Sequence, residues 1–164
     1  MVVVLEKITL NVGIGSGGGV KLENAKKLLE KITEVKPVAT KAKKRNPAFN
    51  IRKGDLIGVK VTLRKKGALN VLNKCLEAVS FRLPASSFDN QGNFSFGVHE
   101  YIELKGVKYD PDLGMIGFDV CATLSKPGKR VGLRRIKPSR VPFKQRVSKK
   151  EAMEFATSLG VEVF

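Results

Sequence analysis

The sequence is poor in the residues on which disulfide, metal and membrane architectures depend. It contains one histidine, His99, and two cysteines, Cys75 and Cys121, which are too few for a disulfide framework and match no zinc-site spacing. We expect both thiols to be reduced and buried. The longest apolar run, Met1–Leu5, is too short for a transmembrane helix or a signal-peptide core, so no membrane partner is predicted.

Acidic residues are almost absent from the most basic parts of the chain. The 164 residues include 31 Lys and Arg against 15 Asp and Glu, and 22 of these bases lie in two stretches. Residues 36–66 hold 11 bases and one acid, and residues 126–150 hold 11 bases and no acid. The remaining 108 residues carry 9 bases and 14 acids. Cationic segments on a mildly acidic body indicate a polyanionic partner.

Residue periodicity predicts an α+β fold in a single domain, residues 1–164. Each predicted strand is apolar on one face only, which is typical of an antiparallel or mixed sheet of four to five strands with helices packed on one face. The predicted strands are Lys7–Val12, Ile57–Arg64, Asn93–Leu104 and Met115–Leu124. The predicted helices are 22–35, with Val35 in its apolar stripe, 68–81, and a last helix opened by a capping box at Ser148–Glu151.

The polar face of the sheet and the two basic segments are predicted to bind RNA. The polar face carries Lys7, Asn11, Lys60, Thr62 and Arg64; the alternative is an ordinary solvated face. The basic loop, residues 41–53, interleaves bases with Phe49 and so offers both charge and a stacking surface. The basic arm, residues 126–147, contains several prolines and glycines, and we expect it to be irregular and to order only against its partner.

No active site or cofactor site is predicted. Residues Gly13–Gly18 match a dinucleotide-binding pattern, but the strand before them alternates instead of being continuously apolar, and no acid for a ribose follows a second buried strand. A turn explains these glycines better. His99 has no nucleophile motif beside it, and Asp110, Asp112 and Asp119 suit a turn without a metal. We therefore expect no small-molecule substrate.

Five segments of the sequence occur in the order that is typical of one protein family. They are Glu6–Gly13, Lys36–Lys43, Phe49–Gly54, Ile57–Arg64 and Ser87–Phe94. Together they resemble the universal family of large-subunit ribosomal protein five, which binds 5S rRNA, and the likeness covers nearly the whole chain. The basic insertion before the Ser148–Met153 segment looks archaeal or eukaryote-like.

The resemblance implies a structural constituent of the large subunit in the cytoplasmic ribosome. Such a protein binds 5S rRNA and helps attach it to large-subunit rRNA in the central protuberance. It reaches the P-site tRNA with the basic loop and bridges to small-subunit ribosomal protein thirteen. The predicted rRNA-binding residues are Lys7, Asn11, Phe49, Lys60, Thr62, Arg64, Lys129, Arg130, Arg134 and Arg135. The predicted tRNA-binding residues are Lys41, Lys43, Lys44, Arg45 and Arg52.

The sequence departs from the family pattern at two places and leaves alternatives open. Val35 stands where the family often has glutamine, and Arg45–Ala48 replaces smaller residues at the loop tip. A free-standing RNA-binding module or RNA chaperone is the alternative function; it would bind many RNAs with similar affinity. An enzyme that used Gly13–Gly18 would instead bind NAD or ATP.

Overall fold

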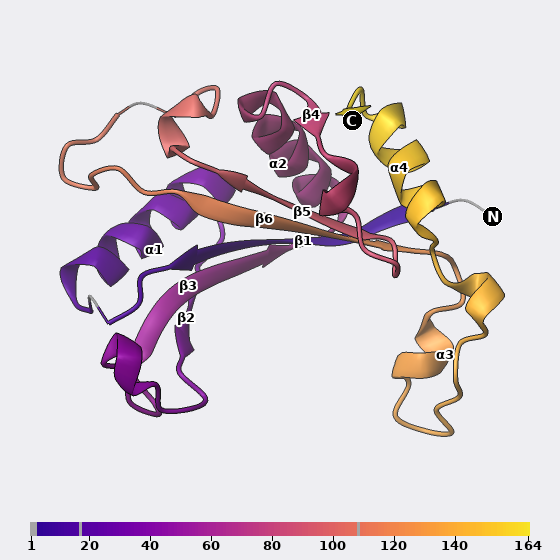
Figure 1. Cartoon of the computed structure of the whole chain (residues 1–164), viewed down its shortest axis with the longest axis horizontal. Coiled ribbons are helices and arrows are strands. Elements are labelled where there is room, and N and C mark those ends of the chain that lie inside the picture. Colours follow the sequence, from indigo (N-terminus) through magenta and orange to yellow (C-terminus); the bar gives the residue numbers. More distant parts are fainter. Residues whose placement is uncertain (1–2, 17, 108) are drawn as a thin grey trace. The chain divides into compact units, whose positions relative to one another are not determined.

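The computed structural model describes residues 3–16, 18–107 and 109–164, which form an α+β fold around a five-stranded antiparallel sheet (Figure 1). The sheet has the strand order β2-β3-β1-β6-β5. Its strands are β1 (Val4–Gly13), β2 (Val38–Lys41), β3 (Leu56–Leu63), β5 (Asn93–Val98) and β6 (Phe118–Ser125). The helices are α1 (Val20–Thr33), α2 (Lys65–Ala78), α3 (Arg130–Leu133) and α4 (Lys149–Ser158). The predicted fold class is confirmed.

The chain divides into two compact units. The first unit comprises the described residues up to Ile8 together with 64–96 and 121–164. The second unit comprises 9–63 and 97–120. Strands β1, β5 and β6 supply residues to both units, whereas each helix lies within one.

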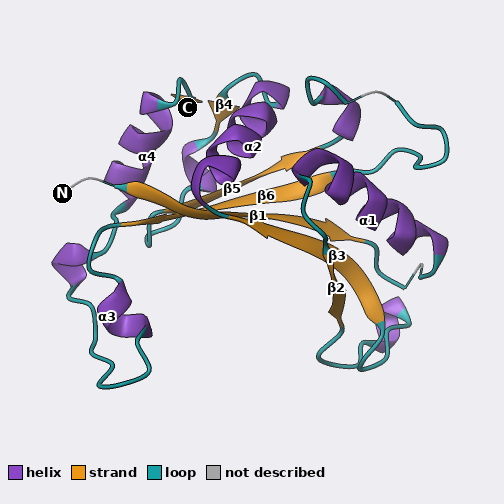
Figure 2. Cartoon of the chain, turned by 180° about the vertical axis from the view of Figure 1, so that it is seen from behind, coloured by secondary structure: helices purple, strands orange, loops and turns teal. Residues whose placement is uncertain are grey.

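In the second unit, α1 lies against β2 and β3 (Figure 2). The buried side chains of α1 recur at helical spacing, as the sequence predicts: Leu22, Ala25, Leu28, Leu29 and Ile32. The helix ends at Thr33 because Glu34 adopts the left-handed conformation, with φ 58°, while its N–H bonds to the carbonyl of Glu30. Val35 therefore leaves the helical stripe and is 42% exposed, so its predicted place in the core is wrong.

Strand β2 was not predicted from the sequence. It pairs antiparallel with β3, with Val38 opposite Lys60 and Thr40 opposite Gly58. Its four residues are too few to show a period, and none of them is fully buried. Gly58 permits close packing here, because a Cβ atom at this position would lie 2.6 Å from the carbonyl oxygen of Val12. The basic loop is thus the tip of a β2–β3 hairpin.

In the first unit, α2 and α4 bury one face each. The buried residues of α2 are Ala68, Val71, Leu72, Cys75 and Leu76. Helix α4 buries Ala152 and Ala156, and the predicted capping box is confirmed because Ser148 and Glu151 bond to each other's backbone N–H groups. A short parallel sheet of β4 (Arg82–Leu83) and β7 (Glu162–Val163) joins the ends of the two helices. Phe88 and Phe94 pack with ring centroids 5.3 Å apart.

Two further sequence predictions need correction. The strand predicted over Asn93–Leu104 ends at Val98, and a 3-10 turn, Tyr101–Glu103, follows it. Tyr101 is fully buried and its hydroxyl accepts a 3.0 Å bond from the N–H of Asp110, whereas Ile102 is exposed. Cys121 is also exposed, because β6 alternates and turns Val120 and Ala122 inward. Only Cys75 is buried, and that burial raises its pKa to about 12.

Candidate nucleic-acid interface

The basic loop of the second unit is held in a defined shape by its backbone. Asn46 and Ile51 exchange two backbone hydrogen bonds of 2.9 and 3.0 Å, and the Asn46 side chain caps the 3-10 turn Pro47–Phe49. At its base, the Asp55 carboxylate accepts a 2.7 Å bond from the N–H of Arg52. The only acid of this stretch therefore shapes the loop, and the cationic side chains are carried on an ordered scaffold.

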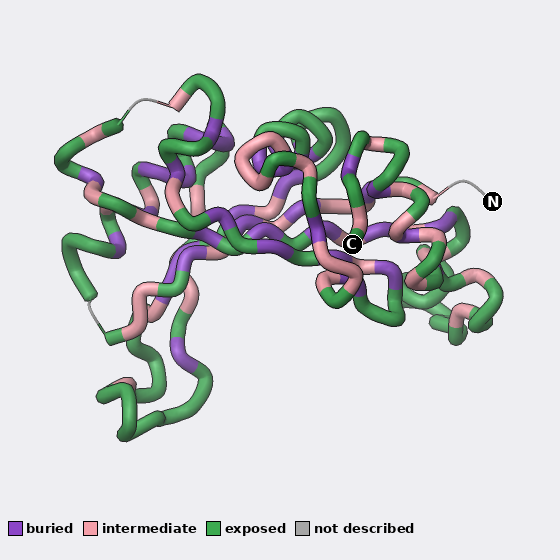
Figure 3. The backbone as a smooth tube through the Cα atoms, turned by 45° about the horizontal axis from the view of Figure 1, so that its top comes forward, coloured by how far each residue is buried: buried purple, intermediate pink, exposed green. Residues whose placement is uncertain are grey.

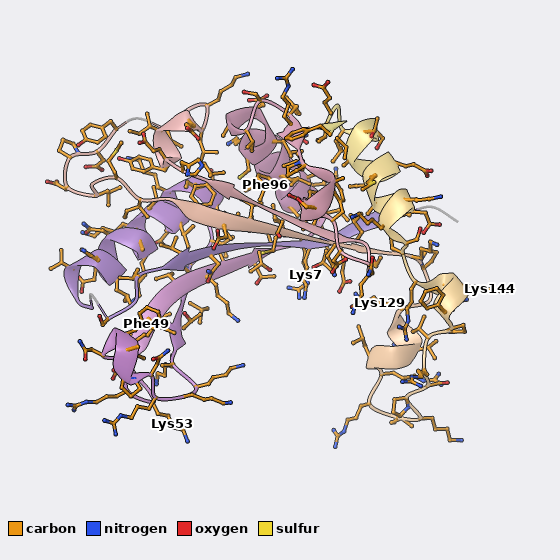
Figure 4. All side chains as sticks on the ribbon, viewed as in Figure 1. Lys7, Phe49, Lys53, Phe96, Lys129 and Lys144 are labelled. Atoms are coloured by element: carbon orange, nitrogen blue, oxygen red, sulfur yellow. The ribbon has the colours of Figure 1, made fainter. Side chains whose placement is uncertain are left out.

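All five predicted tRNA-binding residues lie on the surface of this loop. Figure 3 shows the loop as almost continuously exposed, and Ala42 is its one buried residue. Lys41, Lys43, Lys44, Arg45 and Arg52 form no ion pair with any described residue. Phe49 is 66% exposed, so its ring is available for stacking (Figure 4). The loop thus combines unneutralised cations with an accessible aromatic ring.

The adjoining strands of the second unit carry three of the predicted rRNA-binding side chains. Lys60 is exposed, and Asn11 and Thr62 are half-buried, while their strand neighbours Val12 and Val61 are buried. Strands β1 and β3 are adjacent in the sheet. The side chains of Asn11 and Thr62 form no hydrogen bond within the described part of the chain. Their amide and hydroxyl groups are therefore free to bond to a ligand.

In the first unit, Lys7 is a half-buried base within β1, and Arg64 is the base that directly follows β3. Figure 4 shows Lys7 on the side of the strands away from Phe96. Phe96 is 9% exposed, so the two residues mark the outer and the core side of this part of the sheet. Arg64 is exposed at the residue that precedes α2. The position of Lys7 agrees with the predicted polar face, whereas the strand that was predicted to include Arg64 ends at Leu63.

The basic arm is largely irregular, as predicted, with two short helical elements. It contains α3 and a 3-10 turn, Phe143–Gln145. The Lys126 ammonium donates to the Glu151 carboxylate at 2.6 Å and to the carbonyl of Arg146 at 3.1 Å, so the two ends of the arm are joined. Lys129 pairs with Glu6 on β1. Neither ion pair was predicted from the sequence, because Glu151 lies 25 residues from Lys126 and Glu6 lies 123 residues from Lys129.

These contacts change which bases of the arm can meet RNA. Lys129, a predicted rRNA ligand, already has an anionic partner, and Lys126 is only 9% exposed. Arg130, Arg134 and Arg135 are exposed and carry no ion pair among the described residues. Arg134 also donates a 2.7 Å bond to the carbonyl of Lys137, which fixes its guanidinium beside the turn. The arm therefore presents a cluster of arginines on an anchored base.

Breaking the Lys126–Glu151 contact should loosen the arm without removing any of its exposed arginines. The hydrogen bond from Lys126, followed by the one from the Ser148 N–H, lowers the pKa of Glu151 from 4.5 to about 2. Glu151→Gln should lower the Tm at neutral pH by about 2–5 °C. It should also speed tryptic cleavage between residues 126 and 147. Glu154→Gln, an exposed change on the same helix, is the matched control.

The pH dependence of this difference has a defined sign. A carboxyl group whose pKa is lower in the folded protein than in the unfolded chain stabilises the fold above its unfolded pKa, and loses that contribution as pH falls. The Tm gap between wild type and Glu151→Gln should therefore be complete above about pH 5 and close as pH falls toward 2. A gap that is unchanged at pH 2.5 would show that the substitution acts through another contact.

The alternative catalytic and metal sites gain no support. Ile14 and Gly15 both donate their N–H groups to the carbonyl of Ile57, at 2.9 and 3.1 Å, so this glycine-rich segment begins as a turn. Gly17, part of the dinucleotide-like pattern, lies outside the described residues. His99 is exposed, and the described residues contain no group of three or more side chains that could hold a metal ion. No helix among them is long and apolar enough to span a bilayer.

An α+β fold with exposed, uncompensated bases, an accessible aromatic ring and free polar groups on the sheet defines an RNA-binding protein. Two family models match the sequence in turn: ribosomal protein L5 over residues 1–52, and the ribosomal L5P family C-terminus over residues 56–155. The chain belongs to the ribosomal L5 family. It is accordingly a structural protein of the large ribosomal subunit and not an enzyme.

Curated relatives support this assignment along almost the entire chain. Large ribosomal subunit protein uL5 of Sulfurisphaera tokodaii is 52% identical over 152 residues, which cover 92% of this chain and 85% of the relative. The protein of the same name from Nanoarchaeum equitans is 49% identical over 161 residues, covering 97% and 94%. That of Sulfolobus acidocaldarius is 48% identical over 153 residues, covering 93% and 85%. The predicted family is thus confirmed.

Proposed function

We propose that this chain binds 5S rRNA with the β1–β3 surface and the basic loop of its second unit. The observation that carries the proposal is the combination of free hydrogen-bonding groups on Asn11 and Thr62 with the exposed ring of Phe49. Bases in RNA loops and bulges are bound by such stacking and edge contacts, whereas phosphates are met by lysine and arginine. Lys60 supplies such a cation next to Thr62.

The remaining bases divide between two further RNA partners. The arginines of the arm would contact large-subunit rRNA and so help attach 5S rRNA in the central protuberance. The loop bases Lys41, Lys43, Lys44, Arg45 and Arg52 would reach the P-site tRNA, since they project from an ordered hairpin tip. A bridge to small-subunit ribosomal protein thirteen in the cytoplasmic ribosome completes the proposal. Val35 is exposed but apolar, so it cannot replace a glutamine that bonds to RNA.

Fractionation and RNA competition test this function together. In a sucrose gradient of cell extract, the protein should sediment with the large subunit. The purified protein should bind labelled 5S rRNA, and an unrelated folded RNA of equal length should compete poorly. Absence from the large-subunit fraction would contradict the ribosomal role. Equal competition by both RNAs would instead favour the alternative, a free-standing RNA-binding module or RNA chaperone.

A further inference from the structure

The first unit contains a cleft that the proposed interface does not use. It has a volume of about 460 Å³, within the range of about 300–1,000 Å³ typical of small-ligand sites. Its walls come from the end of β6, from the turn before β5 and from both halves of the basic arm. The arm can form these walls because the Lys126–Glu151 and Lys129–Glu6 contacts hold it in place, and because Val147 is buried beside Gly92.

The walls of the cleft carry polar side chains without intramolecular partners. The side chains of Gln91, Gln145, Thr123, Ser125 and Ser139 form no hydrogen bond with any residue that the structure describes. Two amides and three hydroxyls therefore offer both donors and acceptors toward the cleft. Thr123, Ser125 and Gln145 are half-buried, whereas Gln91 and Ser139 are exposed. Their common location indicates a ligand with hydrogen-bonding edges.

The remaining lining selects the chemical class of that ligand. Leu124, Val141 and Val147 provide an apolar surface, and Arg140 and Arg146 provide positive charge without an anionic partner among the described residues. No Asp or Glu of the described residues lines the cleft, so these residues offer no carboxylate to hold a cation. A flat ring with polar edges and an attached anion fits all three features. A nucleotide has this chemistry.

We propose that the cleft holds one unstacked nucleotide of rRNA, with its base between the apolar and amide side chains and its phosphate at Arg140 and Arg146. The inference rests on the proposed rRNA binding and adds a base-reading site to it. Recognition of a base drawn out of its stack relies on hydrogen bonds to its edge together with apolar contacts to its face. Gln91 and Gln145 would make the edge contacts, since an amide both donates and accepts.

Removal of the two amides tests the site in the full-length protein. In the double variant Gln91→Leu with Gln145→Leu, the side chains keep most of their volume but lose the hydrogen bonds. Affinity should fall roughly tenfold or more for the RNA that supplies the nucleotide, since its base is left unpaired. Two labelled transcripts, 5S rRNA and large-subunit rRNA, identify that source. Asn70→Leu, an exposed amide-to-leucine change on α2 outside the cleft, is the control.

The salt dependence separates base contacts from charge contacts. The double amide variant should not change the slope of log affinity against log salt concentration. Arg140→Gln should reduce this slope by about the amount expected for one phosphate contact. Lys144→Gln removes the same charge from the arm outside the cleft and should leave the crosslinking pattern described next intact. A circular dichroism melt of each variant confirms that the fold is retained.

Ultraviolet crosslinking places the nucleotide directly. Digestion of the irradiated wild-type complex should yield a nucleotide-bearing peptide from residues 139–146 or from 91–93, and the double amide variant should lose it. Unchanged affinity for both RNAs and no such peptide would overturn the inference. The inference would also be overturned if the double amide variant kept its RNA affinity but its purified subunits lacked a neighbouring protein. That result would favour a protein ligand for the cleft. If the wild-type protein does not bind 5S rRNA, the proposed function is wrong. Binding and crosslinking of the large-subunit transcript would then still test whether the cleft holds a nucleotide.

Discussion

Raising the salt concentration should weaken binding of 5S rRNA to this protein by several orders of magnitude. If roughly 6–10 bases meet phosphates, affinity should drop by about 10³–10⁵ between about 50 and 200 mM salt, with duplex-DNA slopes as the guide. Each neutralised phosphate releases condensed counterions, and this release becomes less favourable as the salt concentration rises. RNA loops and single strands give a shallower slope, so we expect a value toward the lower end. The measurement is a filter-binding titration at several salt concentrations.

The structure identifies the bases that should determine this slope. The eleven bases of residues 36–66 have no ion pair within the described chain, whereas Lys126 and Lys129 of the arm are engaged by Glu151 and Glu6. Substitution of Lys60 or Arg64, two exposed bases among the predicted rRNA-binding residues, should therefore flatten the slope, and substitution of Lys126 should not, provided that the fold is retained. A nearly flat titration of the wild-type protein would show that phosphate contacts are not the main contribution.

The sequence was sufficient to predict elements whose side chains repeat with a clear period. Strands β1 and β3 and helices α1, α2 and α4 carry apolar residues at spacing 2 or 3.6, and burial follows those residues. The α+β class follows from these elements, since β1 and β3 are each apolar on one face. The capping box at Ser148 could also be predicted from the sequence, because its two hydrogen bonds join residues only three positions apart.

The missed features depend on contacts between residues far apart in the chain. Strand β2 is four residues long and is defined by pairing with β3, which no period in its own sequence encodes. Tyr101 is buried after the strand has ended, and its hydroxyl accepts a hydrogen bond from the N–H of Asp110. Lys126 and Lys129 of the arm pair with Glu151 and Glu6, which lie outside the arm. Charge counted along the sequence could not reveal that these two lysines are neutralised in space.

Two substitutions should separate 5S rRNA binding from tRNA contact. Thr62→Val keeps the β-branched shape and removes a hydroxyl that has no partner in the described chain. Because Val61 and Leu63 supply the core contacts of this strand, the fold should be retained. Binding of 5S rRNA should weaken by about 1–3 kcal/mol if the hydroxyl bonds to RNA in a buried interface. Thr157→Val, an exposed change on α4, is the shape-matched control.

Replacement of Lys43, Lys44 and Arg45 by alanine should have a different consequence. These residues lie at the exposed tip of the basic loop, and the backbone bonds between Asn46 and Ile51 do not involve their side chains. The loop variant should assemble into the large subunit, while P-site tRNA retention on purified ribosomes should fall. Alanine at Lys21, Lys27 and Lys74, three exposed lysines of α1 and α2, removes the same charge as a control. If the loop variant loses 5S rRNA and Thr62→Val does not, then the two surfaces are assigned to the wrong RNAs.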